Sequence, residues 1–176
     1  MVQGILMEQV LSRKWLSDCH RYTVTIDKKC LGKMLRIASL SHPAEIGGAL
    51  IGRYTHDGFD AFVISATGPP GDSHSQRSTF TRGARGLAKF FLRLYEKFAF
   101  GLHYVGEWHS HPCGLPNPSG IDDESLMRIS RYDRANCSEP ILIIVGGSPN
   151  MGRKLGVYVY SRARGRIRLT PTGDDI

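Results

Sequence analysis

The sequence is poor in cysteine and lacks the cysteine arrangements that bind metals. Its four cysteines are scattered and form no Cys-x-x-Cys pair: Cys19, Cys30, Cys113 and Cys137. This pattern argues against a disulfide framework and against a cysteine-based zinc knuckle. Cys113 lies two residues after His111, and its thiol could approach a metal bound there. An ordinary loop thiol is the simpler interpretation.

Long apolar runs and a secretory leader are also missing. No apolar run reaches the roughly 18 residues of a membrane-spanning helix, and the longest, residues 141–145, has the length of a buried strand. Near the N-terminus, Glu8, Arg13, Lys14 and Asp18 interrupt the charged-then-apolar layout of a signal peptide. We therefore expect a cytoplasmic protein with no membrane attachment.

The chain carries no internal repeat, low-complexity tract or clear interdomain linker. Its 176 residues, 41% of them hydrophobic, are enough for one domain with a core of its own. We expect residues 1–18 to form an N-terminal extension with some helical character at residues 10–16. Residues 19–176 are then the single domain.

Basic residues give the chain a formal net charge of +7. They crowd the last quarter, but they do not interleave with aromatic residues as in sites that stack nucleic-acid bases. Arginines at positions 162, 164, 166 and 168 alternate with smaller or apolar residues, which indicates the solvated face of a strand. A solvated surface is therefore preferred, and nucleic-acid binding is the minority alternative.

Hydrophobic periodicity predicts a mixture of strands and helices. Strands are expected at residues 21–26, 45–54, 59–66, 102–109, 141–145, 155–160 and 167–170. Helices are expected after the capping residue Asp27, at 82–98 with an apolar face in the core, and at 119–135. Residues 68–78 are predicted to be a loop. Because the elements mix without strict alternation, we expect an α+β fold, with a curved mixed sheet packed against helices.

Two histidines and an aspartate have the spacing of a metal site. His109 and His111 lie two residues apart on a predicted strand, so their side chains point to the same face. Three prolines within residues 112–118 stiffen the connection to the next helix, whose first turn contains Asp122. Three such ligands leave a fourth tetrahedral position for water, as in catalytic zinc sites. The sequence therefore predicts one Zn²⁺ per chain.

Two questions stay open from spacing alone. Ser119 and Asp122 also fit a capping box, which needs no metal, although the histidine pair at a fixed distance makes that the weaker interpretation. A zinc hydrolase also needs a proton shuttle that is not a ligand. Glu107 is close to the histidines in sequence, whereas Glu45 reaches them only through tertiary folding.

These residues resemble the JAMM motif of the JAB/MPN metalloprotease family. The resemblance rests on H-S-H-P at residues 109–112, S-G-I-D at 119–122 and E-I-G-G at 45–48, and it covers about residues 20–170. It implies a single JAB/MPN-type domain of the cytidine-deaminase-like class. It also implies a zinc-dependent isopeptidase that acts on ubiquitin-like modifiers.

The resemblance further implies a role for each matching residue. Zinc is held by His109, His111 and Asp122, Glu45 takes a proton from the attacking water and delivers it to the leaving amine, and Ser119 stabilises the oxyanion. Glu107 becomes a strand neighbour of the histidines.

The compact chain is similar to the bacterial single-domain branch of this family. Some members of that branch are encoded beside E1- and E2-like proteins, and some are deconjugating peptidases of antiphage CBASS operons. The implied partners are a ubiquitin-like modifier or its protein conjugate, E1- and E2-like proteins, or a CD-NTase-type enzyme.

Three alternatives remain. A non-catalytic scaffold of the same fold is disfavoured because every ligand is present. A RadC-like DNA-associated protein usually carries Asn where this chain has Ser110 between the histidines. A zinc deaminase needs an H-x-E and P-C-x-x-C pair that the sequence lacks.

Overall fold

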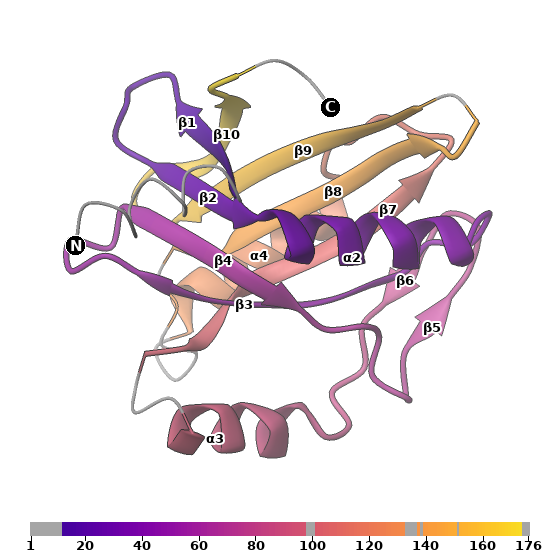
Figure 1. Ribbon diagram of the computed structural model, residues 1–176, viewed down its shortest axis with the longest axis horizontal. Helices are drawn as coiled ribbons and strands as arrows, with labels where there is room; N and C mark the ends of the chain where they lie inside the picture. Colours follow the sequence, from indigo (N-terminus) through magenta and orange to yellow (C-terminus); the bar gives the residue numbers. More distant parts are fainter. Residues whose placement is uncertain (1–11, 98–100, 133–136, 138, 151, 174–176) are drawn as a thin grey trace.

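A computed structural model of the chain describes residues 12–97, 101–132, 137, 139–150 and 152–173. Eight strands pair in the order β1-β10-β9-β8-β7-β3-β4-β2 and close into a barrel (Figure 1). The strands are β1 (Ser12–Ser17), β2 (Thr23–Asp27), β3 (Gly47–Tyr54), β4 (Asp60–Ala66), β7 (His103–Pro112), β8 (Ile141–Ser148), β9 (Gly152–Ser161) and β10 (Gly165–Pro171). The helices are α2 (Lys28–Leu40), α3 (Leu87–Lys97) and α4 (Gly120–Arg131).

The sheet is mixed, as the sequence predicts. β2 pairs with β4 and β7 pairs with β8 in parallel, whereas the remaining barrel pairs are antiparallel. With three helices among the described residues, the chain has the expected α+β character. The closure of the sheet was not part of the expectation, and membership of the cytidine-deaminase-like class stays a prediction.

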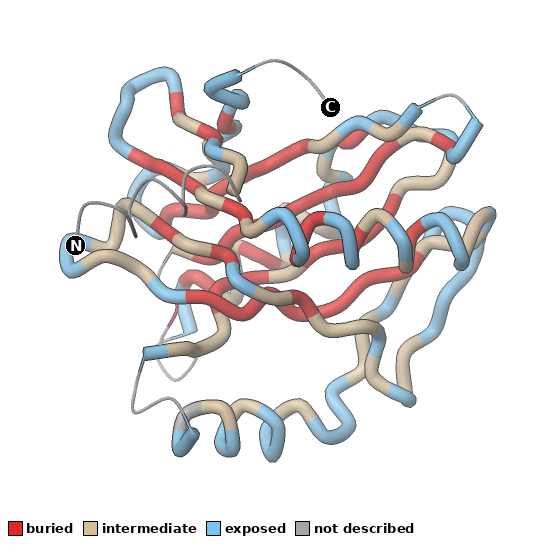
Figure 2. Tube along the Cα trace, viewed as in Figure 1, coloured by how far each residue is buried: buried red, intermediate tan, exposed pale blue. Residues whose placement is uncertain are grey.

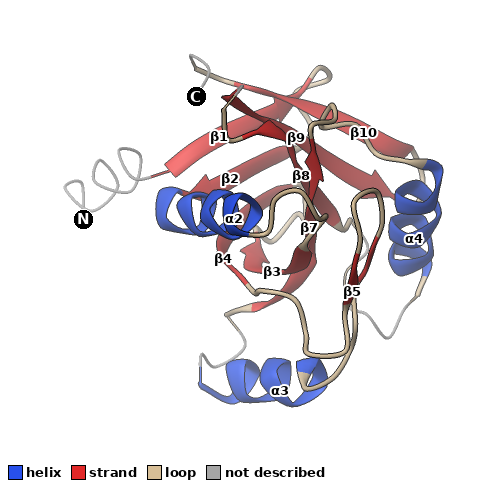
Figure 3. Ribbon diagram, turned by 90° about the vertical axis from the view of Figure 1, so that its right-hand side faces the viewer, coloured by secondary structure: helices blue, strands red, loops and turns tan. Residues whose placement is uncertain are grey.

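Helices cover the two faces of the central strand β8. Ile141, Ile143 and Val145 pack in the core cluster that contains the buried face of α2, whereas Leu142 and Ile144 pack against Leu126 of α4. The alternation follows from the two-residue period of a strand, and burial on both faces explains the continuous apolar run at residues 141–145. Figure 3 shows α2 and α4 on opposite sides of the sheet, and Figure 2 shows that the strands are the most buried part of the molecule.

Helix α2 begins and packs as its sequence predicts. The Asp27 side chain accepts hydrogen bonds from the backbone N–H groups of Lys29 and Cys30, which otherwise lack partners in the first helical turn. The buried residues recur at three- to four-residue spacing: Cys30, Leu31, Met34 and Ala38. The helix ends at Leu40, three residues before Pro43.

The predicted helical character at residues 10–16 is wrong where the structure describes it. Residues 12–17 form β1, which pairs with β2 on one side and β10 on the other. Trp15 and Ser17 are buried and Leu16 between them is half-buried, so the segment has the alternation of a strand rather than the periodicity of a helix. Pairing with two neighbours overrides local propensity here. Residues 10 and 11 lie outside the described part.

The predicted core face of the 82–98 helix is also wrong. α3 begins only at Leu87, and its apolar residues Leu87, Phe91 and Leu94 are half-buried, while Phe90 is 39% exposed. The helix lies to one side of the barrel (Figure 1), where Phe91 makes an edge-to-face contact with Tyr104 of β7. Helical periodicity identifies an apolar face but does not say how much of that face is covered.

Two smaller differences affect the surroundings of the site. The segment predicted as a loop contains one strand of a two-stranded hairpin, β5 (His74–Ser75) with β6 (Phe80–Thr81). The helix predicted at 119–135 ends at Arg131, with Tyr132 as its C-cap, and residues 133–135 lie outside the described part of the chain. None of the helices in the described part of the chain has the length and apolar character needed to cross a bilayer.

Candidate metal centre

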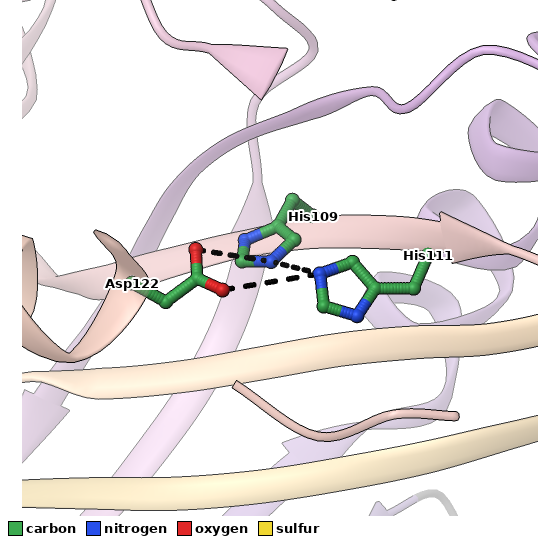
Figure 4. A group of neighbouring side chains, drawn as sticks. All are labelled: His109, His111 and Asp122. Atoms are coloured by element: carbon green, nitrogen blue, oxygen red, sulfur yellow. Dashed lines mark hydrogen bonds and ion pairs between the residues drawn. The ribbon is translucent and has the colours of Figure 1, made fainter. Parts of the chain in front are cut away.

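The two histidines and the aspartate converge as their spacing predicts. β7 runs through Pro112, so His109 and His111 both lie on this strand and point to the same face (Figure 4). Asp122 comes from the first turn of α4. The Nε2 atoms of the histidines lie 3.0 Å apart, and the Asp122 carboxylate lies 3.4 Å from Nε2 of His109 and 3.9 Å from Nε2 of His111.

These separations fit a tetrahedral zinc ion. Zinc–nitrogen and zinc–oxygen bonds are about 2.0–2.2 Å long, so tetrahedral geometry places the ligand atoms about 3.3 Å from one another. The two imidazole nitrogens lie near this separation, and Asp122 faces the histidines with different oxygens, Oδ1 toward His109 and Oδ2 toward His111. With one ligand atom from each residue, the three atoms lie within 4.8 Å of one another. The set is also chemically suitable, because two imidazoles and one carboxylate are a known ligand combination of catalytic zinc.

The tautomer of His111 suits a metal ligand. Its Nδ1 lies 3.2 Å from the carbonyl oxygen of Leu115, which can only accept a hydrogen bond. Nδ1 therefore carries the proton and Nε2 presents a lone pair toward His109 and Asp122. Burial, together with the nearby His109, lowers the pKa of His111, which further favours the neutral ring.

Ser119 forms the capping box and also orients the Asp122 carboxylate. The backbone N–H and the hydroxyl of Ser119 both donate to Oδ2 of Asp122, at 2.7 Å each. The other carboxylate oxygen, Oδ1, faces His109. Burial alone raises the pKa of Asp122, but hydrogen bonds from His109 and Ser119 outweigh it and lower that pKa well below its ordinary value. The two interpretations of the Ser-x-x-Asp motif are therefore compatible.

The proline-containing connection from β7 to α4 packs closely against two glycines, Gly146 of β8 and Gly156 of β9. A Cβ at Gly146 would lie 2.7 Å from the backbone nitrogen of Pro116, and one at Gly156 would lie 2.0 Å from the Pro116 oxygen. The Tyr158 hydroxyl donates to that same oxygen at 2.8 Å. Contact with β8 and β9 thus fixes the segment that carries the chain from the histidines to Asp122.

Glu45 lies close to this centre, just before β3. Burial is the main cause that raises its pKa, and the charges of His109 and Asp122 also act on it. β3 can approach β7 closely because of Gly47, where a Cβ would lie 2.3 Å from the Trp108 oxygen and 2.8 Å from Cβ of His109. The E-I-G-G motif therefore has a physical reason: the glycine permits the contact that brings the glutamate to the histidines.

Glu107, the alternative proton shuttle, is held in an ion pair instead. Its Oε1 accepts hydrogen bonds from Nε and Nη2 of Arg82, at 3.0 and 2.7 Å, and from the Tyr104 hydroxyl at 3.1 Å. Proximity in sequence pointed to Glu107, but its carboxylate stabilises the contact between β7 and the segment before α3.

Sequence reasoning missed several residues that support the centre. The Leu115 carbonyl, Gly146 and Gly156 belong to this group. So does Asp123, which follows the ligand on α4 and accepts hydrogen bonds from Tyr160 at 2.7 Å and from Arg166. Gly146 in an apolar strand was a usable signal of close backbone approach. The Leu115 carbonyl could not be identified from the sequence, because it is a backbone group that every residue type carries.

Cys113, the thiol nearest to the histidines in sequence, is exposed and has a positive φ of 63°.

The fold and the donor set together define a class of protein. It is a mixed-sheet domain with a His-His-Asp cluster that could hold a metal, formed by the end of a strand and the first turn of a helix. Residues 27–158 match the family described as prokaryotic homologs of the JAB domain. The chain belongs to this family.

Individual relatives agree with that assignment. The chain is 40% identical over 148 residues to a "CD-NTase/cGAS isopeptidase" of Enterobacter hormaechei, covering 84% of this chain and 81% of the relative. It is 28% identical to a protein of the same name from Pseudomonas aeruginosa, covering 76% and 82%. It is 27% identical to a "Probable metalloprotease" of Sinorhizobium fredii, covering 72% and 77%.

The fold has a counterpart among solved structures. The solution structure of a protein from Desulfitobacterium hafniense superposes with a TM-score of 0.54 at 20% identity, covering 82% of this chain and 88% of the other. At this identity the likeness concerns the fold alone.

Proposed function

We propose that the protein is a zinc-dependent isopeptidase of the JAMM type. It hydrolyses the bond at the C-terminus of a ubiquitin-like modifier or of a modified protein. The observation that carries the proposal is the convergence of His109, His111 and Asp122, whose ligand atoms lie within 4.8 Å of one another. The charges of His109 and Asp122 also act on Glu45. The family and the names of the relatives support a peptidase.

Each side chain has a definable part in the reaction. His109, His111 and Asp122 hold the ion, which when bound supplies Lewis acidity for activating water and polarising a carbonyl. Glu45 accepts a proton from the attacking water and passes it to the leaving amine. A carboxylate suits this exchange, because the same group can take up a proton and release it again.

Ser119 is proposed to donate its hydroxyl to the developing oxyanion. In the structure this hydroxyl donates to Asp122, but the Ser119 backbone N–H donates to the same carboxylate oxygen independently. The hydroxyl can therefore turn toward the substrate oxygen without releasing the orientation of Asp122. A donor of this kind is worth about 10²–10³-fold in kcat.

The proposed substrate is a protein conjugate in an antiphage conjugation system of the bacterial cytoplasm. Two relatives bear the name CD-NTase/cGAS isopeptidase, one of them at 40% identity. We therefore propose a conjugate of a CD-NTase-type enzyme, formed with the help of E1- and E2-like proteins, as the physiological partner. Nucleic acid is not part of this proposal.

Cleavage of a defined fusion tests the proposal. The purified protein, loaded with one equivalent of Zn²⁺, is incubated with a CD-NTase-type enzyme joined through its C-terminus to a reporter. Hydrolysis at the junction is expected, and it should stop on chelation and return with zinc. A protein that binds zinc with unit stoichiometry and leaves the fusion intact would refute the substrate, whereas one that binds no zinc would favour a scaffold.

A further inference from the structure

Ser110 lies between the two proposed zinc ligands but faces away from them. It is fully buried, with a relative exposure of 0%. On a strand, alternate side chains point to opposite faces, so the rings of His109 and His111 share one face and the Ser110 hydroxyl lies on the other. A polar group buried in this way needs a hydrogen-bond partner.

That partner is the backbone next to Glu45. The N–H of Ile46 donates to Oγ of Ser110 at 3.1 Å, and the N–H of Ser110 donates to the Ile46 oxygen at 2.8 Å. Two hydrogen bonds thus join one residue of β7 to the residue that directly follows Glu45.

One of the two bonds is the regular backbone bond of an antiparallel pair, and the other replaces its counterpart. The antiparallel ladder between β3 and β7 begins with Gly47 opposite His109. In a regular hydrogen-bonded pair one step further, Ile46 would donate to the backbone oxygen of Ser110. Here the side-chain hydroxyl accepts instead, while Ser110 pairs with Val145 of β8 on its other side.

The Glu45 segment is anchored on its far side as well. The N–H of Glu45 donates to the Gln76 oxygen at 2.7 Å, near the β5–β6 hairpin. Two contacts therefore place the Glu45 segment: the hydrogen bond to Gln76 in the hairpin, and the two hydrogen bonds between Ile46 and Ser110. Of these contacts, only those with Ser110 join the segment to the strand that carries the histidines.

We propose that Ser110 is a positioning residue, whose hydroxyl fixes Glu45 relative to the His109–His111 pair. This inference rests on the proposed function, in which Glu45 transfers the proton. Catalytic groups lose efficiency steeply when displaced, and a shift of about 1 Å can cost about 100-fold. The effect should fall on turnover rather than on metal binding, because Ser110 contributes no ligand atom.

Removal of the hydroxyl tests this role. Ser110→Ala is compared with Ser130→Ala, which also deletes a buried serine hydroxyl, one that donates to the Met127 oxygen within α4. For Ser110→Ala we expect kcat to fall about 10- to 100-fold, with KM within about twofold of wild type and zinc content unchanged. Ser130→Ala should keep kcat, while the unfolding midpoints of the two variants fall to a similar extent.

Two further variants make the outcome decisive. Ser110→Cys keeps the shape but is a weaker acceptor, so it should fold and still lose about fivefold or more in kcat; it decides the matter if Ser110→Ala does not fold. In a Glu45→Gln background, Ser110→Ala should cause little further loss, because it acts through the missing carboxylate.

The outcomes separate this inference from the proposed function. A wild-type enzyme that cleaves the fusion while Ser110→Ala and Ser110→Cys retain full kcat would overturn the positioning role alone. Loss of zinc from these variants would also overturn it, since the hydroxyl would then support the ligands. A wild-type protein without zinc-dependent hydrolysis would refute the proposed function and this inference with it.

Discussion

Exchanging two carboxylates separately distinguishes the proton shuttle from a structural acid. Glu45→Gln and Glu107→Gln each replace a carboxylate by an amide of nearly the same shape, on segments that both adjoin the centre. Glu45 is influenced by the charges of His109 and Asp122. The carboxylate of Glu107 is paired with Arg82. The two variants should therefore have opposite phenotypes.

The magnitudes follow from these environments. Loss of a general base costs about 10²–10⁴-fold in rate, which corresponds to about 3–5 kcal/mol of activation free energy. Breaking the Arg82–Glu107 pair should lower stability, because the side chains are only 23% and 16% exposed. Exposed pairs contribute at most about 1 kcal/mol and broken buried pairs cost about 3–5, so we expect a loss of about 1–3 kcal/mol.

Two assays on the same preparations suffice. Turnover of the zinc-loaded variants on the fusion substrate should fall at least 100-fold for Glu45→Gln and by less than about threefold for Glu107→Gln. Thermal unfolding should show the reverse order, with a midpoint lowered by about 2–4 °C per kcal/mol for Glu107→Gln only. Equal turnover in Glu45→Gln and wild type would remove Glu45 from the mechanism, and inactivity of a folded Glu107→Gln would reopen the choice between them.

The remaining predictions concern the metal, the backbone and pH. His111→Ala should reduce zinc stoichiometry from one to near zero, as measured by elemental analysis; full zinc retention would exclude it as a ligand. Gly47→Ala should lower the free energy of unfolding by about 1–3 kcal/mol, because its Cβ would lie 2.3 Å from the Trp108 oxygen. Gly32→Ala should raise the free energy of unfolding by about 0.5–1 kcal/mol, because a Cβ there would meet no atom within 4 Å and alanine favours the helix α2. Glu139 has a pKa raised by burial, and its Oε2 lacks a hydrogen-bond partner among the described residues. The ionised Glu139 therefore lowers the free energy of unfolding, and this loss develops as pH rises above the ordinary pKa of 4.5. In urea titrations, Glu139→Gln should be more stable than wild type at pH 7 and equal to it at pH 3–4. A constant difference at all pH values would contradict this.

The convergence of His109, His111 and Asp122 could be predicted because its signal is local. His109 and His111 share a face through the two-residue period of a strand, and Asp122 follows from a short connection and a helix cap. Buried strand β8 and capped helix α2 were predictable for the same reason, since periodicity and capping involve neighbours in sequence.

The features that the sequence did not predict depend on contacts between residues that are distant in sequence. β1 is a strand because β2 and β10 flank it, and residue types at 12–17 do not show this. The surroundings of Glu45 and Glu107 likewise depend on the pairing of β3 with β7 and on Arg82, which lies 25 residues from Glu107. The hydrogen bond from the Ile46 N–H to the Ser110 hydroxyl also joins residues that lie 64 positions apart in the sequence.

A crystal structure of the protein grown with Zn²⁺ tests the central claim most directly, through anomalous scattering at the zinc absorption edge. We predict one anomalous peak per chain, about 2.0–2.2 Å from Nε2 of His109, Nε2 of His111 and a carboxylate oxygen of Asp122, with a fourth position open to solvent. Imidazoles turned away from each other, with no peak between them at full zinc saturation, would contradict the account.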